Sequence, residues 1–171
     1  MKNSYFFLAL FLAFSCEKQQ VYAPVGGIKK ETDLDVSKEI NKGRNTQERK
    51  FIQDWISKQA EVFYPTSQNY WASLDFKLKE KRTQKHLWSY GYELYDLSGK
   101  KIYNDPIVFT DVIPYKIHEI AAVEDALYYI GVGEEVTLLV PSALAYGTYG
   151  DQNKIPNDLP LLIKLKLTDI K

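Results

Sequence analysis

The chain has 171 residues, enough for one ordinary domain and an additional N-terminal segment. Apolar residues make up 45% of it and aromatic residues 14%, which is ample for one packed core. The 22 basic residues equal the 22 acidic ones and form no stripe, which excludes the basic footprint of a nucleic-acid-binding protein.

The N-terminal segment has the pattern of a secretion signal. Lys2 precedes an apolar run, residues 5–14, that is too short to span a bilayer as a mature helix. We therefore interpret residues 1–15 as a signal peptide that lies outside the fold. Cys16 follows this segment and is the only cysteine, so no disulfide can form within the chain.

A lone cysteine directly after a signal sequence and a small residue, Ser15, resembles a bacterial lipobox. The resemblance implies that the Cys16 thiol is acylated and that Cys16 becomes the new N-terminus. It therefore predicts a lipid-anchored protein of the cell envelope, attached to the outer membrane and facing the periplasm. The alternative is an incidental cysteine beside an ordinary signal-peptide cleavage site.

The next segment, residues 16–44, mixes glycine, proline, lysine and acidic residues without sustained periodicity. We interpret it as a flexible tether, with a partly ordered arm on the domain surface as the alternative. Residues 45–66 differ, because apolar side chains recur there at helical spacing: Phe51, Ile52, Trp55, Ile56, Ala60 and Phe63. They predict an amphipathic helix that Asn45 or Thr46 caps, that Pro65 ends, and that docks its apolar face on its own domain.

Several strands are predicted after this helix. Alternating apolar side chains predict one strand over residues 70–79 and another over residues 87–95. A glycine turn then leads to a third strand that starts at residues 101–103. Residues 104–119 give mixed signals, because two prolines interrupt the apolar triplets.

The second half of the chain predicts a short helix over residues 123–130, with acidic residues in its first turn that suit the helix dipole. Two more strands follow, at residues 137–140 and at residues 161–168, the latter with clear alternation. Since strands dominate and helices are segregated, the predicted class is α+β, with an antiparallel sheet in a domain of residues 67–171 and an extra N-terminal helix.

The residue types exclude several kinds of chemistry. The sequence has no Cys-x-x-Cys, no metal-spaced histidine pair and no phosphate-cradling glycine loop, so we expect neither metal nor cofactor. The paired carboxylates Glu134 and Glu135 follow a glycine and are interpreted as a solvated corner. No hydrolase or redox constellation is present.

One stretch of the sequence points to a family. An apolar run, residues 137–140, is followed by Pro141. A predicted turn of small residues then leads to Tyr146, and Gly147 and Gly150 come after it. From the residues alone, Tyr146 either packs beneath its loop or lines a site. The pattern Val-Pro-Ser-x-Leu-Ala-Tyr-Gly-x-x-Gly, continued through Ile155, resembles the signature loop of FKBP-type peptidyl-prolyl isomerases.

The resemblance implies an FKBP-like antiparallel sheet wrapped on a short helix, and a bowl of aromatic and aliphatic side chains for the proline ring. Two tyrosines match family positions that contact the substrate and are the expected catalytic residues: Tyr92, seven residues before a turn glycine, and Tyr146, whose hydroxyl meets a substrate carbonyl. The remaining expected pocket residues are Ile102, Ile120, Val123, Ile155 and Ile163. Val123 matches the floor of the bowl, and Ile120 matches a residue whose backbone amide binds a substrate carbonyl.

The match to the family is incomplete at the pocket. Several positions that are aromatic in the family are aliphatic here, and Tyr103 stands where the family often has an aspartate. In general, an aromatic and aliphatic pocket with one or two hydroxyls is sufficient for the reaction. Rotating an X-Pro amide faces a barrier of about 18–20 kcal/mol, because resonance is lost in the twisted state. A dry apolar pocket favours the twisted amide, and a few fixed donors hold the flanking carbonyls.

The leader that ends in cysteine, the N-terminal helix and the loop around Tyr146 are similar to FKBP-type lipoproteins associated with gliding motility. This branch implies a membrane-anchored isomerase that helps proline-containing exported proteins of the gliding and secretion apparatus to fold. Two alternatives stay open: a non-catalytic FKBP-like scaffold within that apparatus, and a lipid-anchored spacer whose pocket is merely core. A fully buried Tyr146 hydroxyl with no cavity beside it would favour the spacer.

Overall fold

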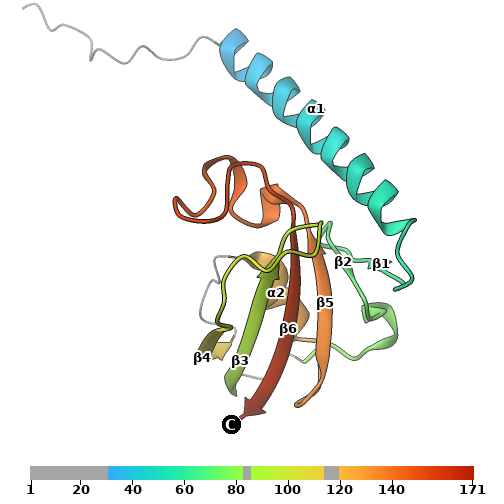
Figure 1. The fold of residues 1–171 in the computed structure, drawn as a ribbon, viewed down its shortest axis with the longest axis vertical. Helices are drawn as coiled ribbons and strands as arrows, with labels where there is room; N and C mark the ends of the chain where they lie inside the picture. The colour runs from blue at the N-terminus through green and yellow to red at the C-terminus, as the bar shows by residue number, and fades with distance from the viewer. Residues whose placement is uncertain (1–30, 83–85, 114–119) are drawn as a thin grey trace, which may run out of the picture. The chain divides into compact units, whose positions relative to one another are not determined.

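The computed structural model of the chain describes residues 31–82, 86–113 and 120–171 (Figure 1). The expected signal peptide, Cys16 and the first half of the expected tether lie outside the described residues. The chain divides into two compact units, Met1–Ser37 and Lys38–Lys171, and the sheet lies in the second.

Within the described residues, six strands form one antiparallel sheet in the order β1-β2-β5-β6-β3-β4. The strands are β1 (Tyr64–Pro65), β2 (Trp71–Ala72), β3 (His86–Tyr95), β4 (Ile107–Ile113), β5 (Glu135–Val140) and β6 (Leu161–Ile170). The helices are α1 (Glu31–Ile56) and α2 (Ala121–Leu127). The predicted α+β class with an antiparallel sheet and an extra N-terminal helix is confirmed.

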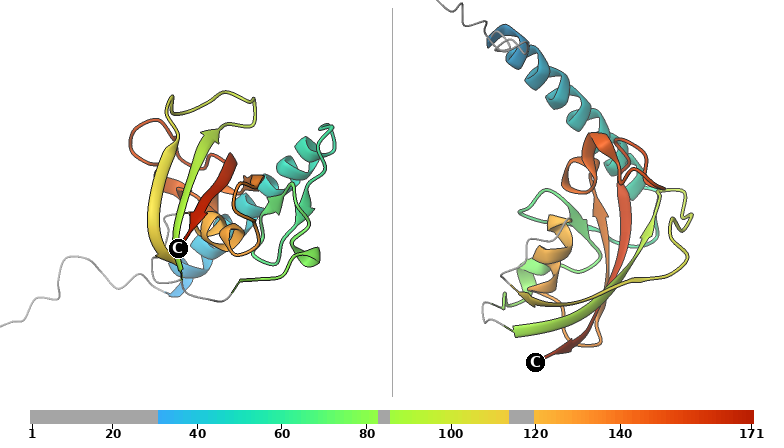
Figure 2. Two further views of the ribbon diagram at one scale, coloured as in Figure 1. Left: turned by 90° about the horizontal axis from the view of Figure 1, so that it is seen from below. Right: turned by 90° about the vertical axis from the view of Figure 1, so that its left-hand side faces the viewer.

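The two longest strands, β3 and β6, each bury one face. The buried side chains are Trp88, Tyr90, Tyr92 and Leu94 along β3, and Leu161, Ile163, Leu165 and Leu167 along β6. Because successive side chains of a strand point to opposite faces, this period of two lines one face of the sheet with apolar groups. Helix α2 covers that face with Val123, Ala126 and Leu127 (Figure 2). The strands predicted at residues 87–95, 137–140 and 161–168 and the helix predicted at residues 123–130 are confirmed, with small shifts at their ends.

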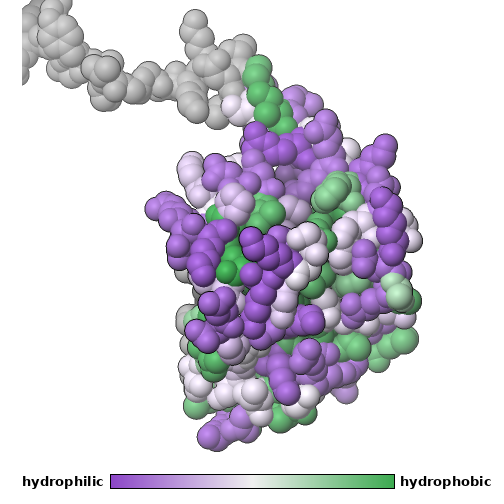
Figure 3. Space-filling model, in the orientation of Figure 1, coloured by the Kyte–Doolittle hydropathy of each residue, from purple (hydrophilic) through white to green (hydrophobic). Residues whose placement is uncertain are grey.

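The opposite face of the sheet is mostly hydrophilic (Figure 3). On this face Glu93 of β3 lies directly opposite Lys164 of β6. Lys101 also pairs with Glu93, with 2.6 Å between Nζ and Oε1. This hydrogen bond lowers the pKa of Glu93 and raises the pKa of Lys101. The core therefore lies on the α2 side of the sheet.

The C-terminal end of α1 docks on the sheet through a second, smaller apolar cluster. The buried members of this cluster are Ile52, Phe63, Trp71 and Leu139. Trp55 packs beside them and donates its indole Nε1–H to the carbonyl of Leu97 at 2.8 Å. The predicted docking of this helix on its own domain is thus confirmed. Among the described helices, none has the length and apolarity needed to cross a membrane.

Helix α1 begins and ends earlier than the prediction of residues 45–66. Its first part occupies residues 31–44, which the sequence analysis assigned to the tether. That stretch lacks an apolar stripe, but it contains one glycine and no proline, so nothing in it breaks a helix. The helix ends at Ile56 in a tight turn, where the amide of Lys58 bonds the carbonyl of Trp55 at 3.1 Å. Pro65 lies beyond the helix, in β1.

Two predicted strands are wrong. Within residues 70–79 only β2 pairs with the sheet, because Asp75 accepts the amide of Lys77 at 3.0 Å and starts the 3₁₀ turn Phe76–Leu78. Residues 101–103 form a single bridge rather than a strand. Residues 104–119, for which the sequence pattern predicted no strand, contain strand β4.

The expected solvated corner is wrong for Glu134 and holds for Glu135, which is exposed. The side chain of Glu134 is only 30% exposed, and its carboxylate contacts Lys79 Nζ at 2.5 Å. It also accepts the backbone amide of Gly131 at 2.7 Å. Burial alone raises the pKa of Glu134, but these hydrogen bonds outweigh burial and hold it below its usual range. Glu134 therefore stabilises the turn before β5 through these two contacts.

Candidate active site

The structure gathers all seven side chains expected to form the site into one apolar cluster between α2 and the sheet. The buried members are Tyr92, Ile120, Val123, Ile155 and Ile163, and the partly buried ones are Ile102 and Tyr146. They come from two strands, a helix and two loops. The fold is therefore what brings them together, since they lie far apart in the sequence.

Strands β3 and β6 place Tyr92 and Ile163 on one wall of this cluster. Tyr92 lies opposite Leu165, two residues from Ile163, so the two side chains are diagonal neighbours on the buried face. Tyr92 also stacks on Phe109 of β4, with 6.0 Å between ring centroids and 21° between ring planes. The sequence analysis missed Phe109, because prolines obscure the strand pattern at residues 104–119.

The start of α2 contributes Ile120 and Val123. Ile120 caps the helix in an extended conformation, and its carbonyl accepts the amide of Val123 at 3.0 Å. Both side chains are completely buried. This hydrogen bond holds Ile120 and Val123 close together at the start of the helix.

The loop between β5 and β6 carries Tyr146. Two 3₁₀ turns, Ser142–Leu144 and Gly147–Tyr149, flank this tyrosine. Tyr146 is partly exposed and packs against the edge of the cluster. The loop therefore holds Tyr146 against the same cluster as Tyr92 and Val123.

A pair that the sequence analysis did not foresee joins this loop to the segment after β3. The hydroxyl of Tyr103 donates a hydrogen bond to the carboxylate of Asp151. The same carboxylate accepts the backbone amides of Asn153 at 2.9 Å and Ile155 at 2.8 Å. The hydrogen bond to Asp151 raises the pKa of the Tyr103 phenol. Asp151 thus ties Ile155, an expected pocket residue, to the segment that carries Ile102.

The chemistry available to this cluster is binding of an apolar group next to a few hydrogen-bond donors. Tyr92, Ile163 and Val123 make the buried interior of the cluster apolar, and Tyr146 lies at its partly exposed edge. Within the described residues, histidine, cysteine, aspartate and glutamate form no group of three or more that could hold a metal ion.

Comparison with known proteins identifies the family. The family model FKBP_C, FKBP-type peptidyl-prolyl cis-trans isomerase, matches residues 79–168. The structure is similar to a peptidyl-prolyl cis-trans isomerase from Pseudomonas syringae pv. tomato str. DC3000, with TM-score 0.53 and 18% identity over 76% of this chain and 95% of that chain. It is also similar to FkpA from Escherichia coli, with TM-score 0.53 and 20% identity over 82% of this chain and 65% of that chain. A search of curated proteins gave no match.

The two solved structures establish that the fold is FKBP-like, and the family match covers more than half of the chain, from just before β3 almost to the end of β6. All seven expected site residues lie within the matched segment. The chain therefore belongs to the FKBP-type peptidyl-prolyl cis-trans isomerase family, and its domain is a peptidyl-prolyl isomerase.

Proposed function

We propose that this chain is a lipid-anchored peptidyl-prolyl isomerase that assists the folding of exported envelope proteins. The observation that carries the catalytic part is the gathering of Tyr92, Val123, Tyr146 and their apolar neighbours into one cluster of an FKBP-like fold. In this proposal a prolyl ring enters the cluster beside Val123, Tyr92 and Ile163, which are buried in the structure. The backbone amide of Ile120 and the hydroxyl of Tyr146 hold the carbonyls on either side of it.

The proposed mechanism uses desolvation and fixed donors rather than a nucleophile or a proton transfer. The apolar cluster favours the twisted amide because its carbonyl is less polarised than that of the planar amide. The Tyr146 hydroxyl supplies a hydrogen bond whose geometry is set in advance by the loop. Together these effects need to lower the barrier by about 4 kcal/mol to give roughly a thousandfold acceleration.

A protease-coupled assay on a short X-Pro peptide tests the catalytic proposal. The full-length chain should accelerate isomerisation, and Tyr146→Phe should reduce kcat/KM about tenfold because one hydrogen bond to the substrate is lost. Tyr149→Phe is the matched control, since Tyr149 lies in the same loop and is 79% exposed. No wild-type rate above background would end the catalytic proposal.

The proposed anchor is a lipid on Cys16. Its support is the sequence pattern of a signal segment that ends in the only cysteine. Growth with a labelled fatty acid should mark the wild-type protein and leave Cys16→Ser unmarked. Fractionation should then find the wild type with the outer membrane. A labelled Cys16→Ser protein would contradict the anchor while leaving the isomerase proposal intact.

The proposed clients are proline-containing exported proteins of the gliding and secretion apparatus. The support is the similarity of the leader, the N-terminal helix and the Tyr146 loop to lipoproteins associated with gliding motility. Loss of the gene in a gliding bacterium should reduce spreading on agar and lower the amount of folded apparatus subunits in the envelope. Normal spreading and normal subunit levels would contradict the proposal that the clients belong to this apparatus.

The second candidate function is a non-catalytic FKBP-like scaffold within that apparatus. It is favoured by the hydrogen bond of Tyr103, at the family's frequent aspartate position, to Asp151. On this reading Tyr146→Phe lowers any isomerase rate and leaves spreading normal. On the catalytic reading the same folded variant spreads poorly.

A further inference from the structure

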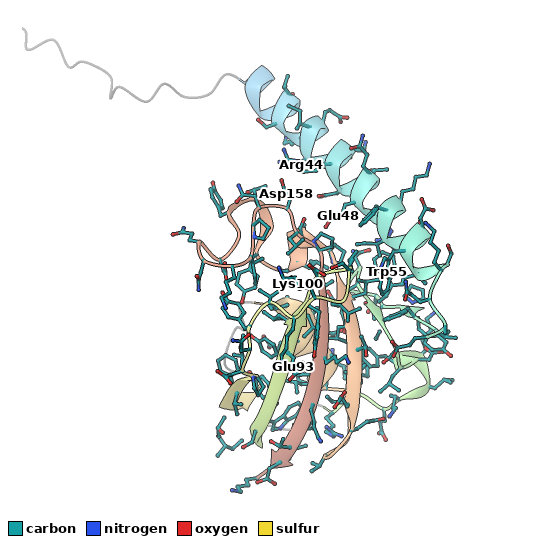
Figure 4. All side chains as sticks on the ribbon, viewed as in Figure 1. Arg44, Glu48, Trp55, Glu93, Lys100 and Asp158 are labelled. Carbon is teal, nitrogen blue, oxygen red and sulfur yellow. The ribbon has the colours of Figure 1, made fainter. Side chains whose placement is uncertain are left out.

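Two side chains of α1, Arg44 and Glu48, reach the loop between β5 and β6 (Figure 4). The carboxylate of Glu48 accepts two hydrogen bonds from Ser142, one from the backbone amide at 2.7 Å and one from the hydroxyl at 2.9 Å. Arg44 Nη1 donates to the carboxylate of Asp158, at 3.1 Å and 3.4 Å from its two oxygens. Because they are four residues apart, Arg44 and Glu48 lie on one side of the helix. We call these two contacts the loop clamp.

The two contacts of the loop clamp fall on either side of Tyr146. Ser142 lies four residues before it, and the carbonyl of Ser142 accepts the amide of Ala145 at 3.0 Å. On the other side, the amide of Asp158 donates to the carbonyl of Gly147 at 2.9 Å, and Gly147 follows Tyr146 directly. Each contact is therefore one backbone hydrogen bond away from a neighbour of Tyr146.

Burial singles out the Glu48–Ser142 contact. Between Asp35 and Phe51 every side chain except Glu48 is exposed, whereas Glu48 is half-buried. Ser142 is 3% exposed and, tyrosines and tryptophans aside, is the one buried polar residue in the described part of the chain. Pro141 caps the turn that Ser142 begins, but supplies no side-chain acceptor. Glu48 provides that acceptor from another element, as a charge-assisted hydrogen bond.

The loop clamp crosses a gap rather than a packed interface. A hollow of about 630 Å³ lies between this part of α1 and the loop, and its lining includes Arg49 of the helix and Pro141 and Leu144 of the loop. The apolar docking of α1 begins further along, at Ile52. Removing the Glu48 carboxylate therefore breaks the contact without opening a cavity in the core.

We infer that the loop clamp positions Tyr146 for the isomerase reaction, with Glu48 as the principal positioning residue. This inference rests on the proposed role of Tyr146. The buried amide and hydroxyl of Ser142 need an acceptor, so the turn shifts toward water when the carboxylate is removed. A displacement of about 1 Å at a group that meets the reacting centre can cost about a hundredfold in rate.

The experiment compares Glu48→Ala with Glu48→Gln in the full-length chain. Glutamine keeps an acceptor for the Ser142 amide and offers its own amide to the hydroxyl, whereas alanine keeps neither. We expect kcat/KM on an X-Pro peptide to fall about tenfold in Glu48→Ala and to stay within about twofold of wild type in Glu48→Gln. The matched control is Asp54→Ala, which removes an exposed carboxylate from the same helix and should leave the rate unchanged.

Amide hydrogen exchange measures the same positioning without relying on activity. In Glu48→Ala the amides of Ser142, Ala145 and Asp158 should exchange faster, while the amides of β6 keep their wild-type protection. If the wild-type chain has no isomerase rate, the proposed function fails and exchange alone decides whether the loop clamp exists. The inference is overturned if these three amides exchange in Glu48→Ala at the wild-type rate. It is also overturned if kcat/KM of Glu48→Gln is as low as that of Glu48→Ala.

Discussion

A Cβ atom on Gly150 would lie 2.1 Å from the backbone carbonyl oxygen of Ile155. The Tyr146 loop therefore folds back on itself so closely that no side chain fits at Gly150. The amide of Asp151 donates to the same carbonyl at 3.1 Å, which holds the approach in place. Gly150 also has φ of +62° and ψ of −162°, a region that is open essentially only to glycine.

Gly150→Ala should consequently destabilise the domain by about 3 kcal/mol, because backbone strain adds to the steric clash. Gly99→Ala is the matched control. Gly99 also has a positive φ, of +84°, but nothing lies within 4 Å of its added Cβ, so about 1 kcal/mol is expected. Urea unfolding of both variants measures the difference, and equal losses would contradict the role of the close approach.

Tyr103→Phe should loosen the same loop at its other attachment. The substitution removes one hydroxyl that donates to Asp151 and keeps the ring, so we expect a loss of about 1 kcal/mol in the free energy of unfolding. Thermal unfolding measures the loss. Tyr149→Phe, at the exposed tyrosine of the loop, should leave the melting temperature unchanged. A Tyr103→Phe variant as stable as wild type would show that the hydrogen bond contributes nothing.

Asp151 should make the stability of the domain fall in acid. Burial raises its pKa, but the hydrogen bonds from Tyr103 and from three backbone amides outweigh burial and hold the pKa below its usual range. A carboxylate whose folded pKa is lowered contributes stability above its unfolded pKa, and this is lost as the pH falls through the folded value. Below about pH 4, wild type should therefore lose more stability than Asp151→Asn. Urea unfolding at a series of pH values checks this, and parallel curves would contradict it.

Trp55→Phe should weaken the docking of α1 on the sheet. The ring still packs against Phe63, which it meets edge-on with 6.0 Å between centroids, but the hydrogen bond to the carbonyl of Leu97 is lost. The carbonyl then lacks its partner, at a cost of about 1 kcal/mol. Phe51→Ala, at a 56% exposed position of the same helix, should change stability by less than about 0.5 kcal/mol. Chemical denaturation of the two variants separates these outcomes.

The elements that the sequence predicts well are those with one buried face and no competing local bond. In β3 and β6 the alternation of apolar and polar side chains continues over the strand, so the period of two is visible. Residues 70–79 carry the same alternation, yet most of them leave the sheet. There the side chain of Asp75 offers a local hydrogen bond that starts a 3₁₀ turn, and the hydropathy pattern does not report it.

The site residues were predicted by matching the signature loop to a family, and the structure brings them into one cluster. Their positions in the core follow from the apolar pattern, but their roles do not. The polar pairs around the site had no signal in the sequence. Glu48 and Ser142 are 94 residues apart, and Tyr103 and Asp151 are 48 apart, so no local periodicity connects them. Such pairs become visible only when the fold places α1 and the segment after β3 beside the loop.

The bond between Glu48 and Ser142 also limits how this chain can diverge. A buried serine whose amide and hydroxyl both depend on one distant carboxylate cannot lose that partner without leaving two donors unsatisfied. Replacement of either residue alone should therefore destabilise the loop more than a paired exchange does. Among relatives that carry this helix, positions 48 and 142 should change together, and this covariation would connect α1 to the loop between β5 and β6.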